Sequence, residues 1–177
     1  KVFMGSSTGS LLVGDEAGLR NMLKVIRRRA SFHAEDEPRL NERKPLRVEG
    51  DASSHPVWRD AQAALIATQR LVRLARETGA RVHVLHVSTA EEMEFLKDYK
   101  DTASVEVTPH HLTMEAPDCY ERLGTRAQMN PPVRDAVHRA AADARKTRDR
   151  LCGGAGGGVH RRHVGRAGPH GHGAGSE

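Results

Sequence analysis

The amino-acid sequence is poor in aromatic residues and in cysteine. Aromatic side chains make up 3% of the 177 residues, and the two cysteines are Cys119 and Cys152. Two cysteines this far apart form neither a disulfide framework nor a multi-cysteine zinc site, which favours a reducing compartment. The sequence also lacks an apolar run of the ~20 residues that a membrane span requires. It likewise lacks a basic start that is followed by a hydrophobic export segment. We therefore expect a cytoplasmic protein with no membrane partner.

The charge is modest and gives no sign of a nucleic-acid partner. Lys and Arg number 28 against 23 Asp and Glu, for a formal net charge of +5. The basic run at residues 27–29 lies at the end of a predicted helix, and no aromatic residues alternate with basic ones as they do in single-strand binders. No GxGxxG follows a predicted strand and no GxxxxGK[ST] occurs, so dinucleotide and phosphate-loop sites lack their main feature.

The composition changes abruptly at Leu151. Residues 151–177 hold ten of the 17 glycines and four of the 11 histidines, with few aliphatic side chains larger than alanine. Such a segment cannot bury a core. We therefore divide the chain into a globular part, residues 1–150, and a Gly/His/Arg-rich tail, residues 151–177. The tail is expected to be disordered or translated out of frame, and the alternative is a genuine metal-binding tail.

Short apolar runs alternate with amphipathic stretches before the tail. This alternation, at intervals of roughly 25 to 45 residues, is typical of a parallel α/β protein. A (β/α)8 barrel takes ~250 residues, so this chain can hold about half of one. The predicted strands are residues 1–4, 30–33, 81–87 and 104–108. The predicted helices are residues 15–29, 61–78 and 134–150, and one that begins at Ser88 or Thr89. Residues 38–56 are predicted to be a long connecting segment, called the excursion below.

Histidines stand where three of the predicted strands end. His33 and His86 each end a strand, and His110 and His111 follow the next one. Functional groups gather at these ends in parallel α/β folds, and imidazole nitrogen suits zinc. Strand alternation places His86 on the face of Val82 and Val84, and His83 on the opposite face and deeper. The alternative is that each histidine is an ordinary hydrogen-bonded loop residue.

Two further residues are ambiguous from the sequence alone. Lys1 leads a strand, where a lysine normally extends to solvent. Asn130 precedes Pro131 and Pro132, which fix an extended backbone. That backbone either presents the Asn130 amide to a ligand or is a stiff connection between elements.

The sequence contains five motifs in this order: KVFMGSSTGSLLV, FHAEDE, RVHVLHVSTAEEM, SVEVTPHHLTM and APDCYERLGTRAQMNPPVRD. At these spacings they closely resemble the middle of the dihydroorotases, in the cyclic amidohydrolase superfamily. The likeness covers about residues 1–140. The related hydantoinases and allantoinases share the lysine and the two histidine positions, and the TPHHL and QMNPPVR stretches favour dihydroorotase.

The resemblance implies a (β/α)8 barrel with a two-zinc centre, of which this chain holds about strands four to seven. Lys1 matches a carboxylated, metal-bridging lysine at the end of the fourth strand, and His33 and His86 match histidine ligands on the fifth and sixth. Asn130 matches a substrate contact. The implied substrates are N-carbamoyl-L-aspartate and L-dihydroorotate, which the family interconverts in pyrimidine biosynthesis.

Two parts of the family's active site fall outside these motifs. The first-strand His-x-His and its arginine are expected before Lys1, and the proton-shuttle aspartate is expected after Arg150, where residues 151–177 contain no aspartate. We therefore expect an internal fragment that has no catalytic residue of its own and is inactive alone. The alternatives are a hydantoinase or allantoinase type of enzyme, and a non-catalytic subunit that assembles with another pyrimidine-pathway enzyme. A homo-oligomer is also compatible with the family.

Overall fold

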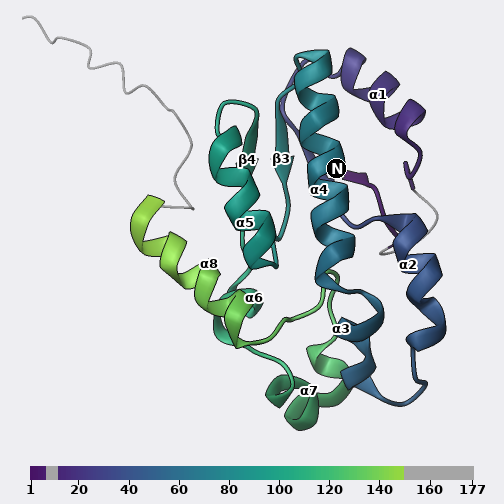
Figure 1. Ribbon diagram of the computed structural model, residues 1–177, viewed down its shortest axis with the longest axis vertical. Helices are drawn as coiled ribbons and strands as arrows, with labels where there is room; N and C mark the ends of the chain where they lie inside the picture. Colours follow the sequence, from purple (N-terminus) through teal and green to yellow (C-terminus); the bar gives the residue numbers. More distant parts are fainter. Residues whose placement is uncertain (7–11, 150–177) are drawn as a thin grey trace, which may run out of the picture.

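The computed structural model describes residues 1–6 and 12–149 (Figure 1). At its centre is a parallel sheet with the strand order β1-β2-β3-β4, so that each strand lies beside the next one along the chain. Consecutive parallel strands need crossover connections, and helices supply them here, as in part of a (β/α)8 barrel. The strands are β1 (Val2–Phe3), β2 (Ala30–His33), β3 (Val82–Val84) and β4 (Ala103–Val105).

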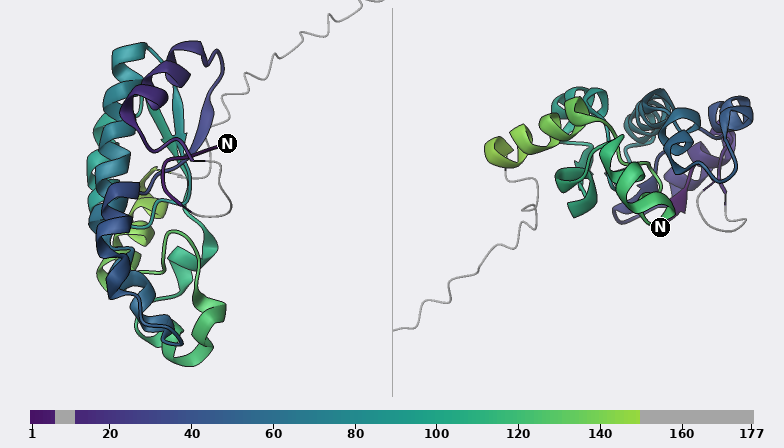
Figure 2. Two further views of the ribbon diagram at one scale, coloured as in Figure 1. Left: turned by 90° about the vertical axis from the view of Figure 1, so that its right-hand side faces the viewer. Right: turned by 90° about the horizontal axis from the view of Figure 1, so that it is seen from below.

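The helices lie mainly on one face of this sheet. The long helix α4 runs along the strands, with α1 on one side of it and α5 on the other (Figure 1; Figure 2). The helices are α1 (Glu16–Val25), α2 (Glu37–Arg43), α3 (His55–Trp58), α4 (Ala61–Thr78), α5 (Ala90–Leu96), α6 (Pro109–Thr113), α7 (Asp118–Leu123) and α8 (Ala136–Asp149). Single 3-10 turns are η1 (Lys44–Leu46), η2 (Ala52–Ser54), η3 (Lys97–Tyr99) and η4 (Gly124–Ala127).

The structure differs from the sequence-based expectation at several intervals, and β3 covers only Val82–Val84 of the strand predicted at 81–87. Helix α1 ends at Val25 because Ile26 is already extended, so the basic run at 27–29 lies in the connection to β2 and not in the helix. The excursion at 38–56 holds more than one helical turn: α2, η1, η2 and the start of α3 occupy most of it. The predicted tail, residues 151–177, lies outside the described residues.

Local side-chain chemistry explains where the three main helices begin. Asp15, Asp60 and Thr89 are the N-caps of α1, α4 and α5, and each side chain accepts a hydrogen bond from a backbone N–H of the first turn. Of the two predicted caps for α5, Thr89 is the one that forms. Helix α4 ends at Gly79, whose φ of 71° is the left-handed conformation that glycine adopts most readily.

The main core lies between α4 and the strands. Leu71 and Leu74 of α4 are fully buried, as are Phe32, Val82 and Val84 of the sheet. A second, smaller cluster joins η2, α7 and η4 and includes Cys119 and Tyr120. Among the described residues, no helix is both long enough and apolar enough to cross a membrane.

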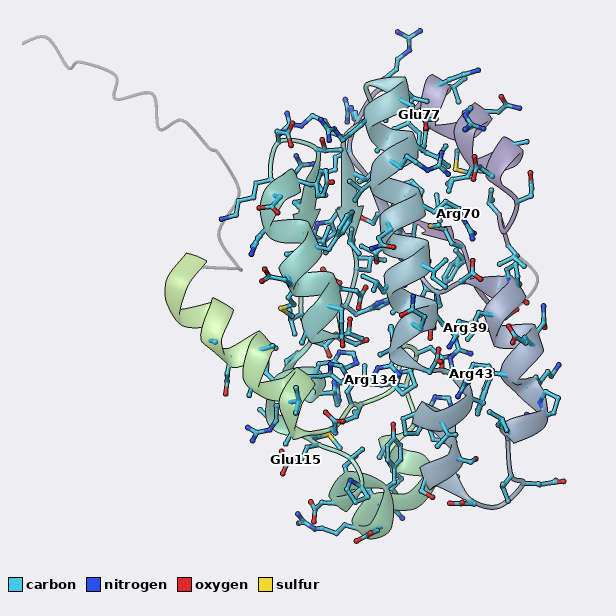
Figure 3. The ribbon with its side chains drawn as sticks, in the orientation of Figure 1. Arg39, Arg43, Arg70, Glu77, Glu115 and Arg134 are labelled. Carbon is cyan, nitrogen blue, oxygen red and sulfur yellow. The ribbon has the colours of Figure 1, made fainter. Side chains whose placement is uncertain are left out.

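Ion pairs hold the segment between β2 and α4 in place. Arg39 and Arg43 of α2 both contact Asp60, the residue that caps α4 (Figure 3). Asp36 caps α2 and pairs with Arg70 on α4. These contacts fix the loop that follows β2, directly after His33.

Candidate metal centre

Two histidines meet at the ends of neighbouring strands. His33 is the last residue of β2, and His86 follows the end of β3 by two residues. His33 Nδ1 lies 3.1 Å from His86 Nε2, and the two rings form an edge-on contact with centroids 4.9 Å apart. His33 is fully buried. The structure therefore brings together two of the three predicted metal ligands.

The backbone at His86 makes this meeting possible. His86 has a φ of 40°, the one positive value at a residue other than glycine among the described residues. The sheet register places Val84 beside Phe32, whereas His33 points to the opposite face from Phe32. Strict alternation would put His86 on the face of Val84, and that alternation does not continue past the end of β3. Such left-handed residues are costly and cluster at functional sites.

The third histidine of this region, His83, takes no part in the pair. Its Nδ1 lies 2.8 Å from the Ser104 hydroxyl and its Nε2 lies 3.2 Å from a Glu106 carboxylate oxygen. These contacts join β3 to the strand next to it. His83 is thus a cross-strand residue within β3. The predicted opposite faces for His83 and His86 are wrong, because the register pairs His83 with Ser31, which shares the face of His33, and His86 meets His33.

A buried ion pair lies directly behind His33. His33 Nε2 is 2.9 Å from Glu35 Oε2, at ion-pair distance but without hydrogen-bond alignment. Arg59 contacts both Glu35 oxygens, and Arg59 and Glu35 are both buried. Burial raises the pKa of Glu35, but His33 and Arg59 outweigh it and lower the pKa to about 2. Glu35 is therefore ionised beside the histidine.

Sequence reasoning missed this pair. Glu35 stands in the FHAEDE motif but reads there as one of several loop acids, and Arg59 lies between the excursion at 38–56 and the helix predicted at 61–78. The only sequence signal was the spacing of Glu35, two residues after a strand-end histidine. Nothing in the sequence pointed to Arg59, because its contact with Glu35 spans 24 residues.

The electrostatic surroundings keep His86 neutral. Burial, followed by the neighbouring His33, lowers its pKa to about 3, and Glu35 opposes the shift. His86 Nδ1 is buried and has no hydrogen-bond partner among the described residues. A neutral imidazole is the form that coordinates a metal ion.

The facing nitrogens fit a zinc ion. Zinc–nitrogen bonds are ~2.05 Å long, so two tetrahedral nitrogen ligands stand about 3.3 Å apart. The observed 3.1 Å between His33 Nδ1 and His86 Nε2 is close to this separation. Within residues 1–6 and 12–149, however, no group of three or more His, Cys, Asp or Glu side chains is placed to hold a metal.

Lys1 lies near the pair but does not touch it. Lys1 adjoins strand β1, which begins at Val2. Its ammonium lies 4.9 Å from the centroid of the Phe3 ring, which lies 5.6 Å from the ring of His33. The Lys1 charge also contributes to the lowered pKa of His86. Lys1 and His33 thus both contact the Phe3 ring.

Asn130 lies on a different segment, between η4 and α8. It is half-buried and its side chain interacts with His55. Arg134, four residues later, is buried and donates to the backbone carbonyls of Arg59 and Asp60. This arginine therefore connects the Asn130 segment to the segment that carries the Glu35 partner (Figure 3).

The chain shares most of its length with known proteins. No protein-family model matches the chain. The dihydroorotase of Methanosphaera stadtmanae is 30% identical over 151 residues, which are 81% of this chain and 34% of that protein. The dihydroorotase of Halobacterium salinarum is 35% identical over 147 residues, 80% of this chain and 33% of that protein. Over this stretch the chain is a dihydroorotase homologue.

Solved structures agree with the fold of the dihydroorotase homologue. The L-hydantoinase (dihydropyrimidinase) from Arthrobacter aurescens superposes with a TM-score of 0.74 at 23% identity, over 81% of this chain and 34% of that one. A dihydropyrimidinase from Brevibacillus agri gives 0.70 at 22% identity, over 81% and 33%. The predicted partial (β/α)8 barrel is confirmed. The chain spans about a third of the length of the relatives it matches.

Proposed function

We propose that this chain carries part of the active site of a zinc-dependent dihydroorotase, which interconverts N-carbamoyl-L-aspartate and L-dihydroorotate in pyrimidine biosynthesis. The observation that carries the proposal is the facing pair of His33 and His86, within a stretch 30–35% identical to dihydroorotases. We also predict that the protein is cytoplasmic. A further prediction is that it assembles, either as a homo-oligomer or with another pyrimidine-pathway enzyme.

In this proposal His33 Nδ1 and His86 Nε2 hold zinc, and a carboxylated Lys1 adds oxygen ligands. Two zinc ions per site are expected for the family. Bound zinc would lower the pKa of a coordinated water to ~7 and would polarise an amide carbonyl. The ionised Glu35 carboxylate lies beside His33 Nε2, so the other ring nitrogen of His33, Nδ1, is free to face His86. The Asn130 amide contacts the substrate ring.

We further propose that the 177-residue chain is inactive alone. The support is the ligand count: the described residues bring together two histidines but no third His, Cys, Asp or Glu side chain to complete a metal site. No aspartate in residues 151–177 is available as a proton shuttle. Binding of metal and substrate by parts of the site is thus expected without turnover.

The test is a titration of the zinc-loaded chain with three cyclic ligands, followed by NMR and by an assay of ring opening. We expect dihydroorotate to shift the Asn130 side-chain amide signals, with no detectable ring hydrolysis. A larger shift with hydantoin or allantoin would favour the hydantoinase or allantoinase type of enzyme. No response to any of the three would favour a non-catalytic subunit, and measurable hydrolysis would contradict the predicted inactivity.

A further inference from the structure

Two buried histidines face the backbone on either side of Asn130. His55 Nε2 lies 2.9 Å from the carbonyl oxygen of Met129, and His111 Nε2 lies 3.1 Å from that of Pro131. A carbonyl oxygen only accepts hydrogen bonds, so each of these ring nitrogens must carry the proton. Asn130 is the residue between the two carbonyls. The two histidines come from α3 and α6, which are 54 residues apart in sequence at their first residues.

His111 is held in this orientation from its other side. Its Nδ1 lies 2.9 Å from the hydroxyl of Thr108, the residue that caps α6. Since Nε2 carries the proton, Nδ1 is the acceptor and the Thr108 hydroxyl donates to it. His111 is 4% exposed, whereas the adjacent His110 is exposed. The ring therefore has a fixed tautomer, with Nδ1 held by Thr108 and Nε2 facing the Pro131 carbonyl.

His55 is held by packing. It is 8% exposed, and its ring stands edge-on to Trp58 with centroids 5.7 Å apart. Its ring interacts with the Asn130 side chain as well as with the Met129 carbonyl. Both histidines are thus neutral donors in a buried setting, where a hydrogen bond that is left unmade is costly.

We propose that His55 and His111 are positioning residues that fix Asn130 by holding the carbonyl on each side of it. The inference deepens the proposed function, because it rests on Asn130 being the contact for the amide of a cyclic substrate. The Asn130 segment has Pro131 and Pro132 after it, which fix φ but donate no hydrogen bonds. Two side chains from elsewhere in the chain contact its carbonyls.

The conservative substitution is glutamine, because its side-chain NH2 can reach the place of the imidazole Nε2. Leucine fills part of the same space but is shorter and has no donor. We would measure backbone 15N relaxation at Asn130 in the full chain for His55→Leu, His111→Leu, His55→Gln and His111→Gln. His110→Leu is the matched control, since it changes an adjacent but exposed histidine.

We expect the order parameter of Asn130 to be near ~0.85 in the wild type and to fall below ~0.6 in both leucine variants. Both glutamine variants and His110→Leu should keep the wild-type value. The amides of Leu19 and Leu23 in α1, in the main core, report whether the fold is intact. The proposal would be overturned if the Asn130 order parameter stayed unchanged in the leucine variants. It would also be overturned if this order parameter fell as far in the glutamine variants as in the leucine variants.

If a leucine variant does not fold, His55→Asn and His111→Asn replace it, because asparagine is one carbon too short to reach the carbonyl. Dihydroorotate titration separates this inference from the function on which it rests. Loss of order in the leucine variants without any dihydroorotate shift in the wild type would support the positioning role and contradict Asn130 as a substrate contact. A ligand shift of unchanged size in the leucine variants would contradict the positioning role.

Discussion

His33 Nδ1 and His86 Nε2 face each other at 3.1 Å, although 53 residues separate them in sequence. Two imidazole nitrogens this close cannot both carry a proton, so either one donates its proton to the other or two lone pairs face each other. A metal ion satisfies both lone pairs at once. His86 Nδ1 is buried without a hydrogen-bond partner among the described residues, and the pKa of the His86 side chain is lowered to about 3. Both observations describe a buried ring that is kept neutral.

The first prediction is that zinc binds between these two rings. His33→Ala or His86→Ala should lower zinc affinity more than ~10-fold, because loss of a ligand should cost at least as much as loss of an outer partner. The measurement is the 15N imidazole shift of the remaining histidine during zinc titration, which excludes zinc held by other histidines. His83→Ala should leave the affinity unchanged, since His83 bonds Ser104 and Glu106 instead. An equal loss in His83→Ala would contradict the assignment.

The second prediction concerns pH. Burial lowers the pKa of His111 from 6.5 to about 4, against the opposing effect of the Pro131 carbonyl. Since the unfolded chain takes up this proton first, the stability that His111 contributes is complete above pH 6.5 and is lost between pH 6.5 and about 4. Linkage puts the loss at about 2 kcal/mol by pH 5.

Urea unfolding at pH 7.5, 6 and 5 measures this loss. In His111→Gln the free energy of unfolding should fall by about 2 kcal/mol less over this range than in the wild type, because glutamine does not titrate. His110→Gln should behave as the wild type, since His110 is exposed. Parallel pH curves for His111→Gln and the wild type would show that His111 titrates normally in the folded state.

Much of the fold was predictable because its signals are local. A capping side chain and a terminal glycine fix where α4 begins and ends, and both lie within a few residues of the helix. The strands ending at His33 and near His86 were visible as short apolar runs. The end of α1 was not, since Ile26 continues the apolar stripe while its backbone is already extended.

The candidate site was predictable only in part, because its remaining contacts are long-range. The strand-end histidines are marked by position. Arg59 reaches Glu35 from 24 residues away, and His55 reaches Met129 from 74 residues away. No periodicity or motif encodes such pairings. The left-handed backbone at His86 was also unpredictable, since histidine there follows a regular strand pattern.

The third prediction is that Glu35 and Arg59 are strongly coupled in stability. Arg59→Met should cost about 3–5 kcal/mol of unfolding free energy, because it leaves a buried carboxylate without its cation. The double variant Glu35→Gln with Arg59→Met should be more stable than Arg59→Met alone, since the uncompensated charge is gone. Urea denaturation of the two single variants and the double variant measures the coupling.

An exposed ion pair provides the control for this cycle. Arg122 and Asp118 on α7 pair at 3.2 Å with both side chains more than half exposed. Removing Arg122 should cost no more than ~1 kcal/mol, because water screens the charge that remains. If Arg59→Met were equally mild, Glu35 would have to be solvated or protonated in the folded chain.

The last prediction separates the backbone of His86 from its ring. A φ of 40° is unfavourable for a residue with a Cβ atom, so His86→Gly should be more stable than His86→Ala by about 1–2 kcal/mol. His83 lies within β3, where glycine should instead be less stable than alanine by about 0.5–1 kcal/mol. Thermal unfolding of the four variants tests this opposite order. Both His86 variants should lose the zinc response of His33 equally, because the ring is absent from each. If His86→Gly proved no more stable than His86→Ala, the left-handed backbone at His86 would not persist in solution. The contact between the His33 and His86 rings would then need a different backbone conformation.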